Sequence, residues 1–220
     1  MSISDKSWTI TKALLICGIV SSLLYIGTDI LLSMRWEGYS YADQAISELS
    51  AIGAPTRPFW LAMSFLFNPL LIAFGVGVWR AAGQKRSLRI TGILLMVWGV
   101  VGFLWLPFPM HLRGAERSFT DTMHIVMTGV TVLLITVFIG FGSGARGKWF
   151  RLYSILTLLA MWGFGAVTGM LASGIDTGTT PWMGAFERVI VYAPMLWVLV
   201  LAVILLRARP LAGSLQRNPK

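Results

Sequence analysis

Six long apolar segments organise this sequence and restrict the folds that are open to it. They are Lys12–Met34, Phe59–Trp79, Ile90–Phe108, Asp121–Phe141, Leu152–Ala172 and Ala185–Leu206. A helix needs roughly 20 apolar residues to cross the hydrocarbon core of a bilayer. Continuously apolar runs favour helices over the alternating pattern of a membrane β-barrel. The sequence therefore predicts an all-α integral membrane bundle of six transmembrane helices with short loops.

The composition agrees with a lipid environment. Of the 220 residues, 56% are hydrophobic and 12% are charged, whereas soluble domains carry about 25% charged residues. Six spans leave no room for a soluble domain. We expect one transmembrane domain over residues 1–210, followed by a basic, disordered cytoplasmic tail over residues 211–220.

The distribution of basic residues predicts the orientation. Thirteen of the 18 Lys and Arg residues fall on the side of the N-terminus, and five fall on the other side. Cytoplasmic loops carry the excess of Lys and Arg, so both termini are expected in the cytoplasm of a multi-pass protein of the cell inner or plasma membrane. The net charge of +9 then reflects topology and attraction to membrane lipids. Nucleic acid is not an expected partner, because the basic residues are scattered over several loops.

Most acidic residues and both histidines fall in the half of the protein opposite the termini. Asp29 lies inside the first segment, where an unpaired charge costs about 2.5–3.5 kcal/mol at the bilayer centre. It shares one helix face with Ser22, Tyr25 and Ser33. We therefore expect Asp29 to face the bundle, either as a structural hydrogen-bonding partner or as part of a functional site.

The fourth segment opens with the pattern Asp-x-x-His. Asp121 and His124 share a helix face with Thr128 and Thr131. Asp121 stands where a residue caps a helix N-terminus. His124 could ligate a metal with Asp121, bind a ligand or relay protons, or serve as a structural side chain; the pattern leaves these readings open.

The sixth and second segments add further polar residues. Glu187 and Arg188 open the sixth segment, and each needs an opposite charge at the membrane boundary. Arg188 is expected to pair with Asp29, and Glu187 with Arg57 or Arg113. In the second segment, Asn68 precedes Pro69 and is expected to hydrogen-bond into the bundle near a kink.

The loop over residues 39–58 carries apolar residues at helical steps. Tyr39, Ala42, Ile46, Leu49 and Ile52 could form one face of an interfacial helix between spans one and two, which the following Gly-Ala-Pro would end. The polar residues between them include Ser47 and Glu48. These two side chains could line the mouth of a pocket or belong to a face exposed to solvent.

Four short motifs together resemble a known family. They are an Asp in the first segment, "SELSAIGAPTRP" entering the second, "DTMH" opening the fourth and "GAFERV" opening the sixth. This set is similar to the bacterial six-span membrane proteins of the DUF998 family, a domain of unknown function. The resemblance covers nearly the whole chain and implies a six-helix integral membrane protein. It assigns no catalytic residue.

A more distant likeness links the chain to the intramembrane hydrolases that include alkaline ceramidases and adiponectin receptors. Those proteins resemble this chain in combining Ser, Asp and His at one membrane face with a zinc ion. This chain departs from them in having six spans and lacking a His-x-x-x-His pair. A zinc site here would need Asp29, Asp121 and His124 as ligands, with Glu48 as the general base.

The sequence leaves three functions open. The leading hypothesis is a polar pocket in the outer half that binds a lipid head group, small solute or ion. Its candidate ligand-binding residues are Asp29, Asn68, His111, Asp121, His124, Glu187 and Arg188, with Glu48 beside them. The alternatives are a metal-dependent hydrolase acting on lipids and a structural membrane subunit, so enzymatic activity stays undecided.

Overall fold

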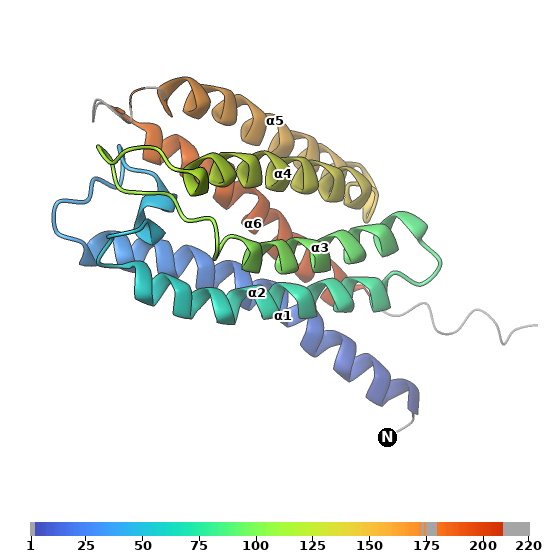
Figure 1. Ribbon diagram of the computed structural model, residues 1–220. Coiled ribbons are helices and arrows are strands. Elements are labelled where there is room, and N and C mark those ends of the chain that lie inside the picture. Colours follow the sequence, from blue (N-terminus) through green and yellow to red (C-terminus); the bar gives the residue numbers. More distant parts are fainter. Residues whose placement is uncertain (1–2, 173, 175–179, 209–220) are drawn as a thin grey trace, which may run out of the picture.

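The computed structural model describes residues 3–172, 174 and 180–208, and all of its long elements are helices (Figure 1). They are α1 (Ile3–Arg35), η1 (Ile46–Ser50), α2 (Arg57–Ala81), α3 (Arg86–Leu104), α4 (Phe119–Gly142), α5 (Gly147–Leu171) and α6 (Met183–Arg207). Six of them are long and apolar enough to cross a membrane. The predicted all-α bundle of six spans is confirmed. The predicted tail over residues 211–220 lies outside the described residues.

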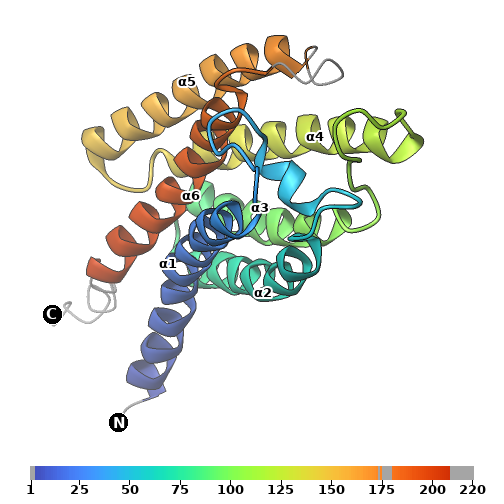
Figure 2. The ribbon, with the colours of Figure 1, turned by 90° about the vertical axis from the view of Figure 1, so that its left-hand side faces the viewer.

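The helices run along a common direction and place the loops at two ends (Figures 1 and 2). One end, here called the η1 end, carries η1 and the α1–α2 and α3–α4 loops. The opposite end carries the α2–α3 and α4–α5 loops, together with the start of α1 and the end of α6. In the bundle, α1 packs on α2 and α6, α2 packs on α3, and α5 packs on α6, while α4 and α5 contact each other least among consecutive helices.

Local chemistry sets the ends of α3 and α4. The third apolar run extends to Phe108, but α3 ends at Leu104. Pro107 and Pro109 follow, and proline cannot donate the backbone hydrogen bond that continues a helix. α4 begins after Ser118, whose backbone N–H donates to Asp121 Oδ2 at 2.8 Å in a capping box.

The half of the bundle away from η1 is filled by aromatic rings from four helices. Phe138 of α4 lies 5.1 Å from Trp98 of α3 and 5.7 Å from Trp197 of α6, measured between ring centroids. Trp197 also stacks on Phe150 of α5 at 5.5 Å and donates its indole N–H to Ser154 at 2.8 Å. These rings join α3, α4, α5 and α6 in that half of the bundle.

The closest helix crossing depends on glycine. A Cβ atom at Gly75 of α2 would lie 2.7 Å from the carbonyl oxygen of Gly92 of α3, and a Cβ atom at Gly92 would lie 2.7 Å from the backbone nitrogen of Trp79. Small residues allow this approach, which van der Waals contact rewards in a membrane. The α2–α3 pair therefore forms a rigid wall of the bundle.

The segment between α1 and α2 contains the expected helix in a shorter form. η1 is a 3₁₀ helix of five residues, and its Ile46 and Leu49 side chains are buried. The residues before it instead form a turn in which Ser40 N–H donates to the Gln44 side chain at 2.8 Å. Beyond η1, Ile52 N–H donates to the Met110 carbonyl at 2.8 Å, which joins the α1–α2 loop to the α3–α4 loop.

Candidate functional site

A cavity of about 1240 Å³ occupies the η1 half of the bundle. All six membrane helices, η1 and the α3–α4 loop contribute to its wall. The part of its wall farther from η1 includes Leu71, Trp98 and Ile135, which belong to the buried apolar core. Charged side chains and histidines line the end near η1 and the α3–α4 loop, among them Arg57, His111 and Glu187, whereas uncharged polar residues such as Asn68 and Thr131 lie deeper, beside the apolar ones. The cavity thus has a charged end and a largely apolar depth.

Asp29 and Arg188 form a buried ion pair that joins α1 to α6. Arg188 donates from Nε and Nη2 to the two carboxylate oxygens of Asp29, each at 2.9 Å, and both side chains are almost fully buried. Tyr192 also donates to Asp29. The predicted Asp29–Arg188 pairing is confirmed. Neither residue is part of the cavity wall.

Arg188 also fixes the segment before η1. Its Nη1 donates to the Tyr41 carbonyl at 2.7 Å and its Nη2 to the Tyr39 hydroxyl at 3.0 Å. The guanidinium carbon lies 3.6 Å from the centroid of the Tyr41 ring. Because these contacts and Asp29 use its donors, Arg188 acts inside the protein as an anchor rather than as a free group at the cavity.

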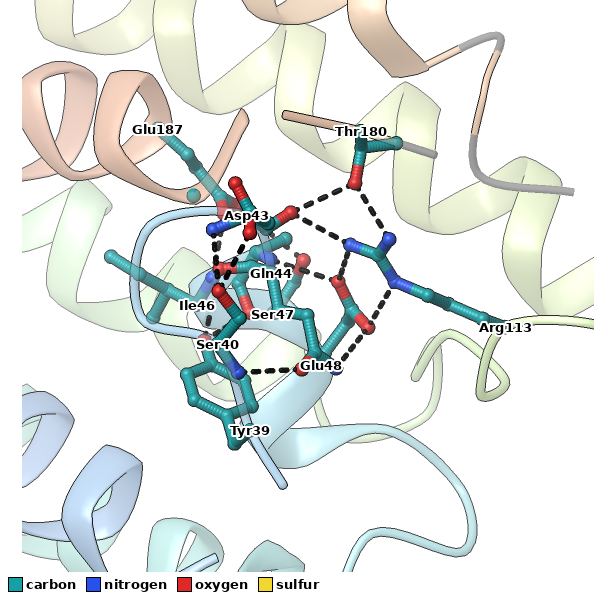
Figure 3. A network of polar contacts seen from close by, with 12 residues as sticks. Tyr39, Ser40, Asp43, Gln44, Ile46, Ser47, Glu48, Arg113, Thr180 and Glu187 are labelled. Atoms are coloured by element: carbon teal, nitrogen blue, oxygen red, sulfur yellow. Dashed lines mark hydrogen bonds and ion pairs between the residues drawn. The ribbon is translucent and has the colours of Figure 1, made fainter. Parts of the chain in front are cut away.

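Arg113 binds Glu48 (Figure 3), and Glu48 is not among the residues that line the cavity. Arg113 Nη2 and Nε donate to the two Glu48 oxygens at 2.7 Å each. The backbone N–H of Ala45 donates to the same carboxylate at 2.8 Å, and Glu48 is 0% exposed. The hydrogen bond to Glu48 raises the pKa of Arg113. The structure therefore does not place Glu48 at the pocket mouth, where the general-base hypothesis needs it.

Asp43 ties the same loop to the start of α6. Its carboxylate accepts the backbone N–H of Trp182 at 2.9 Å and the Ser40 hydroxyl at 2.8 Å. These hydrogen bonds, that from Trp182 foremost, hold the pKa of Asp43 below its ordinary value of 3.8. The ionised form of Asp43 consequently stabilises this loop.

Asp121 binds His111 rather than His124. Its Oδ2 lies 2.8 Å from His111 Nδ1, and its Oδ1 accepts the backbone N–H of His111 at 2.7 Å. The Nδ1 of His124 instead lies 3.0 Å from the Phe108 carbonyl oxygen. Both histidines and Asp121 line the cavity. The expected Asp-x-x-His partnership is wrong because the α3–α4 loop folds back and brings His111 to Asp121.

The candidate zinc ligands do not converge. Asp29 is held by Arg188, whereas Asp121 is held by His111. Within residues 3–172, 174 and 180–208, no group of three or more His, Cys, Asp or Glu side chains is arranged to hold a metal ion. The set Asp29, Asp121 and His124 is therefore not assembled in this structure.

Three buried side-chain atoms lack a hydrogen-bonding partner, and all three belong to residues that line the cavity. They are Asn68 Nδ2, Thr131 Oγ1 and Thr168 Oγ1, and they are all such side-chain atoms in the part of the chain that the structure describes. All three residues line the cavity wall, and Asn68 is only 5% exposed. Sequence periodicity singled out Asn68 and Thr131, but the hydrogen bond expected from Asn68 into the bundle is not made by its Nδ2. Sequence periodicity missed Thr168, whose polar role is visible only once α5 is placed beside the cavity.

Glu187 lines the cavity and has no cationic partner among the described side chains. Its carboxylate accepts the backbone N–H of Ile46 at 2.6 Å and the Ser47 hydroxyl at 3.4 Å. The expected pairing with Arg57 or Arg113 is wrong. Arg57 donates to a backbone carbonyl of η1, and Arg113 is bound to Glu48.

The cavity is continuous with the lipid-facing surface between α4 and α5. Three of its lining residues are strongly exposed: Ile125 at 65%, Leu133 at 58% and Trp162 at 49%. Gly129 and Gly165 also line it, and a Cβ atom at either would meet no atom within 4 Å. Trp162 donates its indole N–H to Thr136 at 3.1 Å across this gap. Part of the cavity wall between α4 and α5 is thus exposed on the outside of the bundle.

Six apolar helices around this cavity define a multi-pass integral membrane protein. The chain belongs to the family described as "Protein of unknown function (DUF998)", whose family model matches residues 19–204. The resemblance inferred from the four sequence motifs is confirmed. No curated protein and no solved structure matches the chain.

Proposed function

We propose that the cavity binds a membrane amphiphile, a molecule with a polar head and at least one hydrocarbon chain. The observation that carries this proposal is that three residues lining the cavity, Asn68, Thr131 and Thr168, each hold a buried polar atom without a hydrogen-bonding partner. A buried polar group left unpaired costs about 1–3 kcal/mol. A polar occupant of the cavity would remove that cost at each atom.

The size and lining of the cavity support an occupant with a chain. Pockets for drug-sized ligands span about 300–1,000 Å³, and this cavity measures about 1240 Å³. Its depth is lined by Leu71, Trp98 and Ile135. Apolar walls that face empty space lose dispersion contacts, which a hydrocarbon chain would restore. A small solute or ion leaves that part of the cavity unfilled.

The opening between α4 and α5 supports entry from the bilayer. The exposed side chains of Ile125 and Leu133 belong to both the lipid-facing surface and the cavity wall. An amphiphile could therefore enter sideways with its chain in apolar surroundings throughout. Its head would face the charged end of the cavity, near His111 and Glu187.

The excess of Lys and Arg at the opposite end supports an orientation with that end in the cytoplasm. The amphiphile would then come from the outer leaflet of the cell inner or plasma membrane. Reporter fusions after residues 83 and 145 are expected to be cytoplasmic, and fusions after residue 114 are expected to be outside. The reverse pattern would contradict this orientation.

A pair of glycine substitutions on α5 tests binding. Gly165 lines the cavity, whereas Gly163 does not, and a Cβ atom at either would meet no atom within 4 Å. Gly165→Trp is expected to reduce the lipid that copurifies with the protein, as measured by native mass spectrometry. Gly163→Trp is the matched control and is expected to leave bound lipid unchanged. Equal amounts of lipid on wild type and both variants would contradict the proposal.

The two alternative functions have less support from the geometry. A zinc-dependent lipid hydrolase would need ligands other than the set Asp29, Asp121 and His124, because Arg188 already binds Asp29. Metal analysis of the purified protein tests it, with zinc lost in His124→Ala as the supporting result. A structural subunit accounts for the buried ion pair of Asp29 but gives no reason for three unpaired polar atoms in residues that line one cavity.

A further inference from the structure

The carboxylates held by helices at the η1 end differ in one respect. Asp29, Glu48 and Asp121 each have an arginine or histidine nitrogen within 2.9 Å. Glu187, the fourth, has none among the residues that the structure describes, and it lines the cavity. A carboxylate removed from water without a countercharge is strongly disfavoured. The cavity is the open side from which a countercharge can arrive.

We propose that Glu187 is the subsite for an ammonium group on the head of the bound amphiphile, which makes the ligand an aminolipid such as an aminophospholipid. This inference rests on the proposed function and names the ligand class for the same cavity. Two donors from η1, Ile46 N–H and the Ser47 hydroxyl, fix one side of the carboxylate. An ammonium group supplies three N–H donors and a full positive charge to the other side.

Neither of the neighbouring arginines, Arg113 and Arg188, forms an ion pair with Glu187. Arg188 follows it directly, but successive residues on a helix point about 100° apart, and Arg188 turns to Asp29. Figure 3 shows Arg113 reaching Glu48 from the α3–α4 loop, while Glu187 approaches the η1 segment from α6. Asp29 and Glu48 are thus each neutralised by an arginine, whereas Glu187 has no such partner among the described residues.

The cavity wall around Glu187 suits a head group that carries an ammonium and, next to it, a phosphate. Tyr25 and Trp60 line the cavity with their rings in a T-shaped arrangement at 5.5 Å, and aromatic faces attract ammonium groups. Arg57 lines the same end of the cavity. Its guanidinium donates to the Ser50 carbonyl and retains other N–H donors, which suit a phosphate. A head that carries both an ammonium and a phosphate would satisfy both charges.

Asn68 lies where the acyl chains of such a lipid would begin. At 1.5 Å per residue, Glu187 lies about 6 Å below the first residue of α6, and Asn68 about 16 Å below the first residue of α2. The amide is therefore the deeper group. The carbonyl oxygens of an acylated lipid follow the head group toward the chains, so they would meet the unpaired Nδ2 of Asn68.

The experiment is a titration of the purified protein with phosphatidylethanolamine or phosphatidylglycerol, followed by native mass spectrometry. These lipids share the phosphate and acyl chains, and the first alone carries an ammonium. Wild type is expected to bind phosphatidylethanolamine about tenfold more tightly, which corresponds to about 1.4 kcal/mol. Glu187→Gln keeps an acceptor for Ile46 N–H and is expected to abolish this preference. Glu37→Gln, at an exposed position outside the cavity, is the matched control and is expected to retain it.

A second test changes the lipid instead of the protein, so it does not require a variant that folds. N-acetylated phosphatidylethanolamine has no ammonium group and is expected to bind wild type about tenfold more weakly than the parent lipid. Equal binding of both lipids by wild type, or an unchanged preference in folded Glu187→Gln, would overturn the ammonium subsite and leave the amphiphile proposal standing. Absence of any bound lipid, with no effect of Gly165→Trp, would overturn both.

Discussion

The ion pair between Asp29 and Arg188 allows a quantitative test of the packing of α1 against α6. Asp29 lies six residues before the end of α1, about 9 Å into the bundle at 1.5 Å per residue. Removing one partner of a buried pair costs about 3–5 kcal/mol, and a lone charge in a membrane helix costs about 2.5–3.5 kcal/mol. We expect Arg188→Leu and Asp29→Leu each to lower the free energy of unfolding by about 3 kcal/mol.

The double variant distinguishes an unpaired charge from lost packing. Asp29→Leu/Arg188→Leu leaves no lone charge, so its loss is expected to be smaller than that of either single variant and well below the sum of about 6 kcal/mol. The assay is unfolding in mixed micelles by titration with SDS, followed by circular dichroism. Arg35→Leu, at the exposed end of α1, is the control and is expected to change stability by less than about 0.5 kcal/mol. Additivity of the two single losses within about 0.5 kcal/mol would refute the pairing argument.

Three further predictions concern the η1 end. Gly102→Ala places a methyl group against the Asn68 amide. It is expected to lower the free energy of unfolding by about 1–3 kcal/mol and to reduce bound lipid. An unchanged amount of bound lipid in native mass spectrometry would contradict the role of Asn68. Arg113→Lys loses the two-point contact with Glu48 and is expected to lower the melting temperature, whereas an unchanged value would show that this contact is dispensable. Because the pKa of Asp43 is lower in the folded protein, its stabilisation is present above its ordinary value of 3.8 and is lost as the pH falls through the folded value. Asp43→Asn is therefore expected to melt below wild type near neutral pH, with a difference that vanishes in acid; a constant difference would be evidence against this linkage.

The number and approximate limits of the helices could be predicted from the sequence because lipid imposes one requirement on every span. Each apolar run had to be helical to satisfy its backbone hydrogen bonds. The errors in the predicted helix limits fall at the helix ends, because local residues determine where a helix stops. α3 ends before Pro107 rather than at Phe108, and the helix after Tyr39 is reduced to η1 by a turn at Ser40.

The candidate site could be predicted only in part, because some of its charged residues bind partners that lie in loops. The Asp29–Arg188 pair followed from the rule that a membrane charge seeks its opposite. The same rule did not identify Arg113 as the partner of Glu48, because it gives no information on how the α3–α4 loop folds. Helical spacing likewise placed His124 with Asp121, although a residue in that loop takes its place. An unpaired atom such as Asn68 Nδ2 becomes visible only when every neighbour is placed.

The most direct test of the central claim is photocrosslinking from inside the cavity. Benzoylphenylalanine is placed at Val132, which lines the cavity, and at Leu159, which is 64% exposed and lies outside its lining. After irradiation in membranes, adducts are identified by mass spectrometry. If the cavity holds an aminolipid, the probe at Val132 captures a narrow set of amine-bearing lipids, while the probe at Leu159 captures the bulk lipids in proportion to their abundance. A Val132 probe that captures no lipid, with Leu159 labelled normally, would contradict the central claim.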